Sequence, residues 1–201
     1  MFLKYIFDRL TAFTGLLFIL PFLLIIGILI KIKMPGGSAI FKQKRVGLNG
    51  KLFTMYKFRT MSISHSGSSV SVKGESRITP LGAKLRKYKL DELPELWNIF
   101  IGNMSFVGPR PDVPGYADAL TGNDRDILKL RPGITGPASL KYRNEEELLS
   151  LQSNPIEYNN EIIYPDKVRI NLYYLHNWSF WLDIEIIIYT ILSKDLDEKY
   201  Y

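Results

Sequence analysis

The sequence contains no cysteine and only two histidines, His65 and His176. The lack of cysteine excludes a disulfide framework, a thiol nucleophile, thiolate-bound zinc and iron–sulfur clusters. Two histidines are too few for a catalytic zinc ion held by three of them. A metal ion in this protein would therefore be a hard cation bound by carboxylates.

Acidic residues are missing from one long stretch of the chain. Residues 9–74 hold ten basic side chains and no acidic one, although the net charge of the whole chain is only +6. This asymmetry indicates a polyanionic partner, which could be substrate phosphates, a nucleic acid or an anionic membrane surface. With 201 residues, 46% of them hydrophobic, the chain is long enough for one domain with its own core.

The N-terminal region carries an uncharged run of 21 residues, Leu10–Ile30. As a helix, this run would extend roughly 30 Å, the thickness of the hydrocarbon core of a bilayer. It is too long for a signal peptide, and no small-x-small cleavage site follows it. Pro21 lies at its centre and should kink the helix. The run is either a single spanning anchor or a re-entrant helix that is broken at Pro21 and has both ends in the cytoplasm. Basic residues flank it on both sides: Lys4, Arg9, Lys31 and Lys33.

The remaining chain predicts an α/β protein that is mainly helical and has one short β-hairpin. Residues 39–44 and 52–60 read as strands around a Gly-Leu-Asn-Gly turn. Residues 62–74 read as a mobile Ser/Gly-rich loop, in which His65 would be solvated. Thr79 and Pro80 are expected to cap a helix that runs to Lys89. Further helices are expected over residues 91–100, 116–129, 166–176 and 180–193, with another that begins at residue 144. Residues 102–115 and 131–137 are expected to form Pro/Gly-shaped loops.

The C-terminal region combines an apolar stretch with aromatic residues. Asp183 and Glu185 interrupt this stretch, which makes it too charged to span a membrane. It is either an interfacial amphipathic helix or a buried core helix, and periodicity does not separate the two. The aromatic residues that favour the membrane interface are Tyr173, Tyr174, Trp178, Phe180 and Trp181.

Asp91 and Glu92 form a carboxylate pair at an expected helix start. The helix dipole there would favour the ionised form of Asp91, which could bind magnesium or attack a phosphorus atom. When the pair is taken alone, ordinary helix capping is the better explanation. Cations on strands and rigid loops favour phosphoryl transfer instead, because that chemistry depends on positioning and charge neutralisation. These candidate substrate-binding residues are Lys57, Arg59, Arg86, Arg110, Arg131 and Arg143.

The motifs of this chain match a known family in order and over most of its length. The chain resembles the bacterial sugar transferases called monotopic phosphoglycosyl transferases. The matching segments are FKQKRVG (41–47), YKFRTM (56–61), ITPLG (78–82), LDELPELWN (90–98), GNMSFVGPRP (102–111), RPGITG (131–136) and Arg143-Asn144.

The resemblance implies transfer of a sugar 1-phosphate from a UDP-sugar to polyprenol phosphate, with undecaprenyl phosphate as the expected acceptor. UMP would be released, and the step would initiate the synthesis of a cell-surface glycan. It also implies that Asp91 is a nucleophile, that a phosphosugar-aspartyl intermediate forms, and that Asp91 and Glu92 bind Mg²⁺ or Mn²⁺. Residues 1–33 would form a re-entrant helix in the bacterial inner membrane, in contact with its lipids. Residues 34–201 would form a catalytic domain associated with the cytoplasmic face.

Two residues depart from the family pattern, which has a serine where Leu20 stands and usually an aspartate where Asn103 stands. The segment PRPDVPGY is similar to members that use N-acetylated amino or deoxy sugars, while the sugar, the pathway and a homodimer stay open. A second hypothesis is a membrane-tethered basic module that binds nucleic acid or anionic lipid, and a third is an inactive scaffold. The dyad and the arginine-bearing loops favour the enzyme, for which no nucleic-acid partner is expected.

Overall fold

The computed structural model describes residues 1–63, 77–194 and 196. The expected loop with His65 lies outside these residues, apart from its first two positions. The chain divides into two compact units. The first comprises Met1–Lys44 and Thr54–Gly102, and the second comprises Arg45–Phe53 and Asn103–Tyr201.

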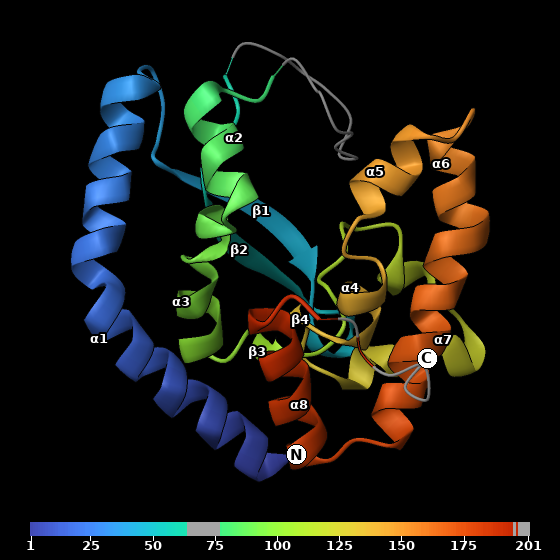
Figure 1. The fold of residues 1–201 in the computed structure, drawn as a ribbon. Coiled ribbons are helices and arrows are strands. Elements are labelled where there is room, and N and C mark those ends of the chain that lie inside the picture. The colour runs from blue at the N-terminus through green and yellow to red at the C-terminus, as the bar shows by residue number, and fades with distance from the viewer. Residues whose placement is uncertain (64–76, 195, 197–201) are drawn as a thin grey trace. The chain divides into compact units, whose positions relative to one another are not determined.

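The first unit begins with one long helix, α1 (Phe2–Lys33), which contains Pro21. Figure 1 shows that its two halves run in different directions, as expected for a proline that removes one backbone hydrogen bond. The helix is long and apolar enough to cross a membrane. Most of its apolar side chains are exposed, and Phe18 reaches 82%. The structure thus confirms that the N-terminal segment is a candidate membrane helix, and this helix is bent but continuous.

One side of α1 packs within its own unit. Near its N-terminus, Phe13 stacks on Phe100 with ring centroids 5.5 Å apart. The Arg9 guanidinium lies so close to Gly102 that a β-carbon there would come within 2.2 Å of it. Toward its C-terminus, Ile26 and Ile30 are buried in a core that also includes Phe58. The hydrophobic segment therefore has one face that contacts protein and one that does not.

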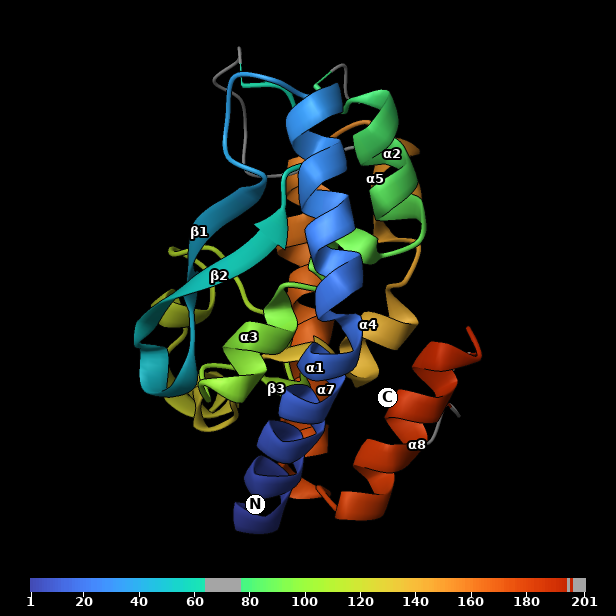
Figure 2. The ribbon, with the colours of Figure 1, turned by 90° about the vertical axis from the view of Figure 1, so that its left-hand side faces the viewer.

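The β-hairpin is confirmed, with β1 (Ile40–Val46) joined to β2 (Leu52–Phe58) through the 3₁₀ turn η1 (Leu48–Gly50). Asn49 has a φ of 55°, a left-handed conformation that asparagine tolerates better than most residues. Figure 2 shows the two strands as a twisted ribbon.

Helix α2 (Pro80–Lys87) begins as its sequence predicts. The Thr79 hydroxyl accepts a hydrogen bond from the Gly82 amide, and Pro80 occupies the first helical position. The expected single helix over residues 91–100 is wrong in part. A 3₁₀ turn, η2 (Leu90–Glu92), precedes a shorter helix, α3 (Glu95–Phe100).

The described part of the second unit contains several short helices and two longer ones, of 13 and 12 residues. The expected α-helix over residues 116–129 is instead 3₁₀ structure, η3 (Ala117–Ala119) and η4 (Gly122–Lys129). The helices expected from residue 144 and over 166–176 and 180–193 are confirmed. After residue 136, the structure describes the helices α4 (Pro137–Lys141), α5 (Glu145–Ser150), α6 (Pro155–Tyr158), the π-helix η5 (Asn159–Ile163), α7 (Tyr164–His176) and α8 (Phe180–Ile191).

The two Pro/Gly segments contain a pair of parallel strands that the sequence did not reveal. Strand β3 (Ser105–Val107) pairs with β4 (Gly133–Thr135), and Ser105 lies opposite Gly133. Helix α8 packs against both strands (Figure 1). The Thr190 and Thr135 hydroxyls, 2.7 Å apart, join α8 to β4.

The aromatic residues near α8 divide into two groups. Tyr174 is completely buried and donates a hydrogen bond to Asp183, and the Trp178 indole donates to the same carboxylate at 3.0 Å. Tyr174 is therefore not a membrane-surface residue, which corrects that expectation. Trp181 is 78% exposed, and Ile188 and Ile191 are exposed on the same helix. Helix α8 thus has a buried face and an exposed apolar face.

Candidate active site

The carboxylate pair lies in the turn between α2 and α3. Lys89 has a φ of 55° and ends α2 in a left-handed conformation, which redirects the chain into η2. Asp91 is only 9% exposed, and its Oδ1 has no hydrogen-bond partner among the described residues. A buried acceptor of this kind is costly unless a ligand or cation satisfies it.

Lys57 on β2 is bound by two carboxylates. Its Nζ lies 2.9 Å from Oε1 of Glu92 and 3.1 Å from Oε1 of Glu95. The three side chains are only 17%, 11% and 4% exposed, respectively. Glu95 is a participant that the sequence analysis missed, because a glutamate in a first helical turn is ordinary. The structure thus assembles three acidic residues and one lysine in a small, largely buried cluster.

The helix dipole expected to favour the ionised form of Asp91 is not the dominant influence on its pKa. Desolvation by burial raises the pKa of Asp91, and the neighbouring charge of Glu92 raises it further, while Lys57 and Lys89 act in the opposite direction. Asp91 lies in the 3₁₀ turn before α3, and that helix has only six residues. Burial therefore outweighs any helix-terminus effect at this position.

Asn98 holds the carboxylates of the η2–α3 segment against β2. Its amide nitrogen donates to the Thr54 carbonyl at 2.7 Å, and its Oδ1 accepts from the Tyr56 amide at 3.0 Å. The side chain, which is fully buried, thereby pairs with the backbone on both sides of one strand residue. This contact fixes α3 beside Lys57, and an asparagine inside a short helix is the signal that could have revealed it.

Two of the expected substrate-binding arginines lie in this first unit. Arg59 is buried, and its guanidinium donates to the Met34 carbonyl that follows α1. Arg86 is half-buried in the last turn of α2. The Thr60 carbonyl accepts from both the amide and the hydroxyl of Thr79, and this contact joins the end of β2 to the start of α2. That Arg59 and Arg86 bind substrate remains a prediction.

The other three arginines belong to the second unit, where the structure brings the segments of two together. The Gly133 amide donates to the Pro109 carbonyl at 2.8 Å. A β-carbon on Gly108 would lie 2.3 Å from the Arg131 carbonyl oxygen, so only glycine permits this approach. Arg110 and Arg131 therefore project from neighbouring stretches of backbone.

Arg143 contacts a different part of the second unit, the residues that follow α8. Its guanidinium donates to the Ser193 carbonyl at 2.5 Å and to the Lys194 carbonyl at 2.6 Å. Both carbonyls lie just beyond the end of α8, where backbone acceptors lack helical partners. Arg143 thus stabilises a helix terminus, and its role in substrate binding remains a prediction.

Asp112 follows the Arg110 segment and has a shifted pKa. The residue is half-buried, but its carboxyl group lies among protein atoms, and desolvation raises its pKa to about 6. Tyr164 donates a hydrogen bond to this carboxyl at 3.2 Å, which lowers the pKa but does not cancel the shift. The charged groups that act on Asp112 are Lys167, Arg45 and Glu145.

The donors available for a metal ion are the dyad carboxylates. No cluster of three or more aspartate, glutamate or histidine side chains in metal-binding geometry occurs among the described residues. Magnesium is commonly held by one or two carboxylates together with substrate phosphates. Asp91, with its unsatisfied Oδ1, and Glu92 fit that arrangement.

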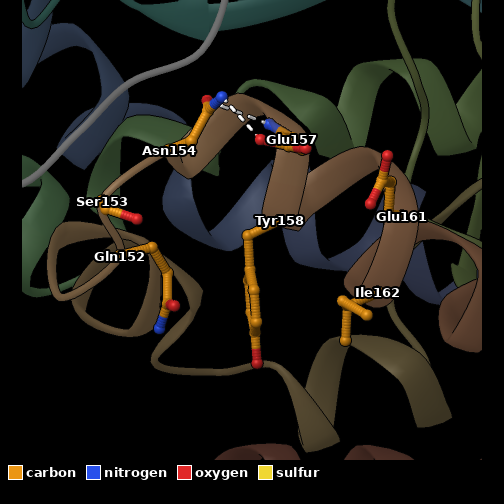
Figure 3. Close-up of a pocket in the computed structure, with 7 residues that line it drawn as sticks. All are labelled: Gln152, Ser153, Asn154, Glu157, Tyr158, Glu161 and Ile162. Carbon is orange, nitrogen blue, oxygen red and sulfur yellow. Dashed lines mark hydrogen bonds between the residues drawn. The ribbon is translucent and has the colours of Figure 1, made fainter.

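Two surface cavities in the described part of the second unit contain no expected site residue. One, of about 190 Å³, lies among residues 152–162 (Figure 3). It is smaller than typical ligand sites, and Asn154 and Glu157 bond to each other at its rim. The other, of about 440 Å³, lies beside the rings of Tyr116 and Tyr164, which meet edge to face.

Comparison with known proteins gives the family. The model of the family described as bacterial sugar transferase matches residues 1–194. The chain belongs to the bacterial sugar transferase family. This sugar transferase is 36% identical to EpsL, an uncharacterized sugar transferase of Bacillus subtilis, over 95% of this chain and 86% of EpsL.

Other relatives carry names that state an activity or a process. UDP-glucose:undecaprenyl-phosphate glucose-1-phosphate transferase of Klebsiella pneumoniae is 33% identical over 92% of this chain, but over only 38% of its own length. The exopolysaccharide production protein PSS of Rhizobium leguminosarum is 35% identical over 96% of this chain and 94% of PSS. The chain thus spans most of the shorter relatives and less than two fifths of the longer one. The expectation of a sugar transferase is confirmed.

Proposed function

We propose that this sugar transferase moves a sugar 1-phosphate from a UDP-sugar to undecaprenyl phosphate and releases UMP, as the first membrane step of glycan assembly. The buried Asp91 beside Glu92 carries the proposal, because its Oδ1 lacks a partner among the described residues, and a cation or a phosphorus centre would satisfy this acceptor. The names of relatives that use UDP-glucose and undecaprenyl phosphate support the substrate classes. The segment that follows Arg110 favours an N-acetylated amino or deoxy sugar as the group transferred.

The proposed reaction has two displacements at one phosphorus atom. A carboxylate oxygen of Asp91 attacks the phosphorus that bears the sugar, the bond to the bridging oxygen breaks, and UMP leaves with that oxygen. A phosphate oxygen of undecaprenyl phosphate then attacks the same phosphorus and displaces Asp91. The products are the lipid-linked diphosphosugar and free carboxylate.

Other charged residues would hold and orient the reacting groups. Glu92 is held by Lys57, which fixes its carboxylate next to Asp91. Arg110 and Arg131 would hold the diphosphate of the donor with charge-assisted hydrogen bonds. Mg²⁺ or Mn²⁺ bound by Asp91 and Glu92 would neutralise phosphate charge during the transfer.

The test is a screen of UDP-sugars for UMP release with undecaprenyl phosphate in detergent. One UDP-sugar should release UMP, and Asp91→Asn should abolish release while the protein still unfolds at the wild-type temperature. Glu92→Gln should be severely impaired yet still retain labelled sugar phosphate on Asp91. Release by Asp91→Asn near the wild-type rate would rule out the covalent mechanism.

We also propose that α1 is re-entrant and that both of its ends lie in the cytoplasm. The bend of α1 (Figure 1), the presence of Pro21 inside this helix and the basic residues on both flanks support this topology. The Thr14 hydroxyl donates to the Leu10 carbonyl one turn earlier in the same helix, at 3.0 Å.

Cysteine labelling tests the topology, because the chain has no native cysteine. A single cysteine in place of Phe2 should resist a membrane-impermeant maleimide in intact cells and react after lysis. A cysteine in place of Lys51 on the hairpin turn serves as the cytoplasmic control. Labelling of the first variant in intact cells would mean that α1 spans.

A further inference from the structure

The backbone around Arg110 is held at every neighbouring position. Arg110 lies between Pro109 and Pro111, and the residue before a proline is restricted to extended conformations. The carbonyl of Pro109 accepts from the Gly133 amide at 2.8 Å. The carbonyl of Pro111 accepts from the Arg45 guanidinium at 3.0 Å.

The next residue, Asp112, is held through both its backbone and its side chain. Its carbonyl accepts from the Val46 amide at 2.9 Å, and its carboxylate accepts from the Tyr164 hydroxyl at 3.2 Å. Arg45 and Val46 end β1, and Tyr164 begins α7. Two distant parts of the sequence thus converge on two consecutive residues beside Arg110.

Arg110 itself is exposed, in contrast to the residues that hold it. A long cationic side chain on a fixed backbone loses less conformational freedom when it binds an anion. We infer that Arg45, Asp112 and Tyr164 are positioning residues that fix the Arg110 backbone and so strengthen its binding of the nucleotide diphosphate. This interpretation assigns Arg45 of the FKQKRVG motif to loop anchoring and not to substrate contact.

The expected effect on nucleotide binding rests on the proposed function, whereas the contacts that fix the Arg110 backbone do not depend on it. If the fixed conformation is only part of the population, the apparent affinity falls by the same fraction. Loss of one hydrogen bond should therefore weaken nucleotide binding about fivefold. The loss should disappear when Arg110 has already been replaced.

The test is a double-mutant cycle on UDP binding, measured by calorimetry on the full-length protein in detergent. Tyr164→Phe should weaken binding about fivefold in the wild-type background and not at all in an Arg110→Gln background. The matched control is Tyr116→Phe, because that hydroxyl lies on the adjoining ring and donates to Asn160 at 3.0 Å. It should leave the affinity unchanged. Equal losses in both backgrounds, or no loss from Tyr164→Phe, would overturn the inference.

Hydrogen exchange separates failure of the inference from failure of the proposed function. Peptides that contain the Val46 and Gly133 amides should exchange faster in Tyr164→Phe and Arg45→Gln than in wild type or Tyr116→Phe. If wild type neither binds UDP nor releases UMP, the proposed function fails. The exchange pattern then tests by itself whether Arg45 and Tyr164 fix the Arg110 backbone. Unchanged exchange in both Tyr164→Phe and Arg45→Gln would show that these residues do not fix the Arg110 backbone, even if the enzyme is active.

Discussion

Replacement of Lys57 by methionine is the sharpest test of the buried cluster. Methionine fills a similar volume but leaves Glu92 and Glu95 without the ammonium that lies 2.9 and 3.1 Å from their carboxylates. Removing one partner of a buried ion pair typically costs 3–5 kcal/mol. Because Lys57 retains some contact with solvent, we expect a loss of about 3 kcal/mol in the free energy of unfolding. For a chain of this size, that corresponds to a fall of roughly 6–12 °C in melting temperature.

The same substitution should also affect catalysis. Lys57 lowers the pKa of Asp91, so its loss leaves three neighbouring carboxylates in a desolvated place. Without the positive charge of Lys57, the pKa of Asp91 should rise further, and a larger fraction of this carboxyl would be protonated and unable to attack phosphorus. We therefore expect UMP release to fall at least about 100-fold. The assay is initial-rate UMP release at saturating undecaprenyl phosphate, at a temperature well below the melting point of the variant.

A double substitution separates charge from packing. Lys57→Met with Glu95→Gln removes one cation and one anion together, and it should recover part of the lost melting temperature. Lys57→Arg should retain most of the stability, because a guanidinium can bind both carboxylates. If Lys57→Met has wild-type stability and releases UMP within a fewfold of the wild-type rate, the ion pairs of Lys57 with Glu92 and Glu95 are needed neither for stability nor for catalysis.

The remaining predictions concern the metal, Asn98 and Asp112. Excess EDTA should stop UMP release and added Mg²⁺ should restore it, whereas full activity in EDTA would exclude a metal-dependent site. Asn98→Ala leaves a buried amide and carbonyl of β2 unpaired, so the melting temperature should fall by roughly 8 °C; an unchanged value would contradict the proposed docking of α3. Asp112 has a folded-state pKa raised from 3.8 to about 6, so it disfavours folding increasingly as pH rises from about 4 to 6. Relative to wild type, Asp112→Asn should gain up to about 3 kcal/mol over that interval, measured by unfolding at several pH values, and a pH-independent difference would refute the assignment.

Local signals in the sequence predicted the elements whose causes are local. Thr79 and Pro80 start α2 because a hydroxyl cap and a fixed φ act within one turn. The hairpin follows in the same way from a turn that contains Asn49. The β3–β4 pair escaped prediction because three-residue strands among glycines and prolines carry no periodic pattern. Their pairing depends on the close approach of Gly108 to Gly133, which only the folded backbone reveals.

In the candidate site too, the sequence identified residues but not their burial or their partners. The sequence predicted Asp91 and Glu92, but it attributed the state of Asp91 to a helix terminus, whereas burial dominates. It grouped Lys57 with the substrate-binding cations, because the charge of a side chain is visible in a sequence and its partner is not. Glu95 lies 38 residues from Lys57 in the chain, and contacts such as that of Asn98 with β2 bring them together only in the folded protein.

The short, irregular elements of the protein lie where its chemistry is expected. The dyad lies in a 3₁₀ turn that begins after a left-handed lysine, and Arg110 lies between two prolines whose carbonyls are both bonded. Regular helices satisfy their own backbone groups, so they leave few main-chain atoms to fix a neighbouring segment. Irregular segments have unpaired amides and carbonyls, and the hydrogen bonds that satisfy these groups also fix nearby side chains. Each irregular segment is therefore held by contacts from distant residues, and substitutions in those residues should affect the reaction without touching a substrate.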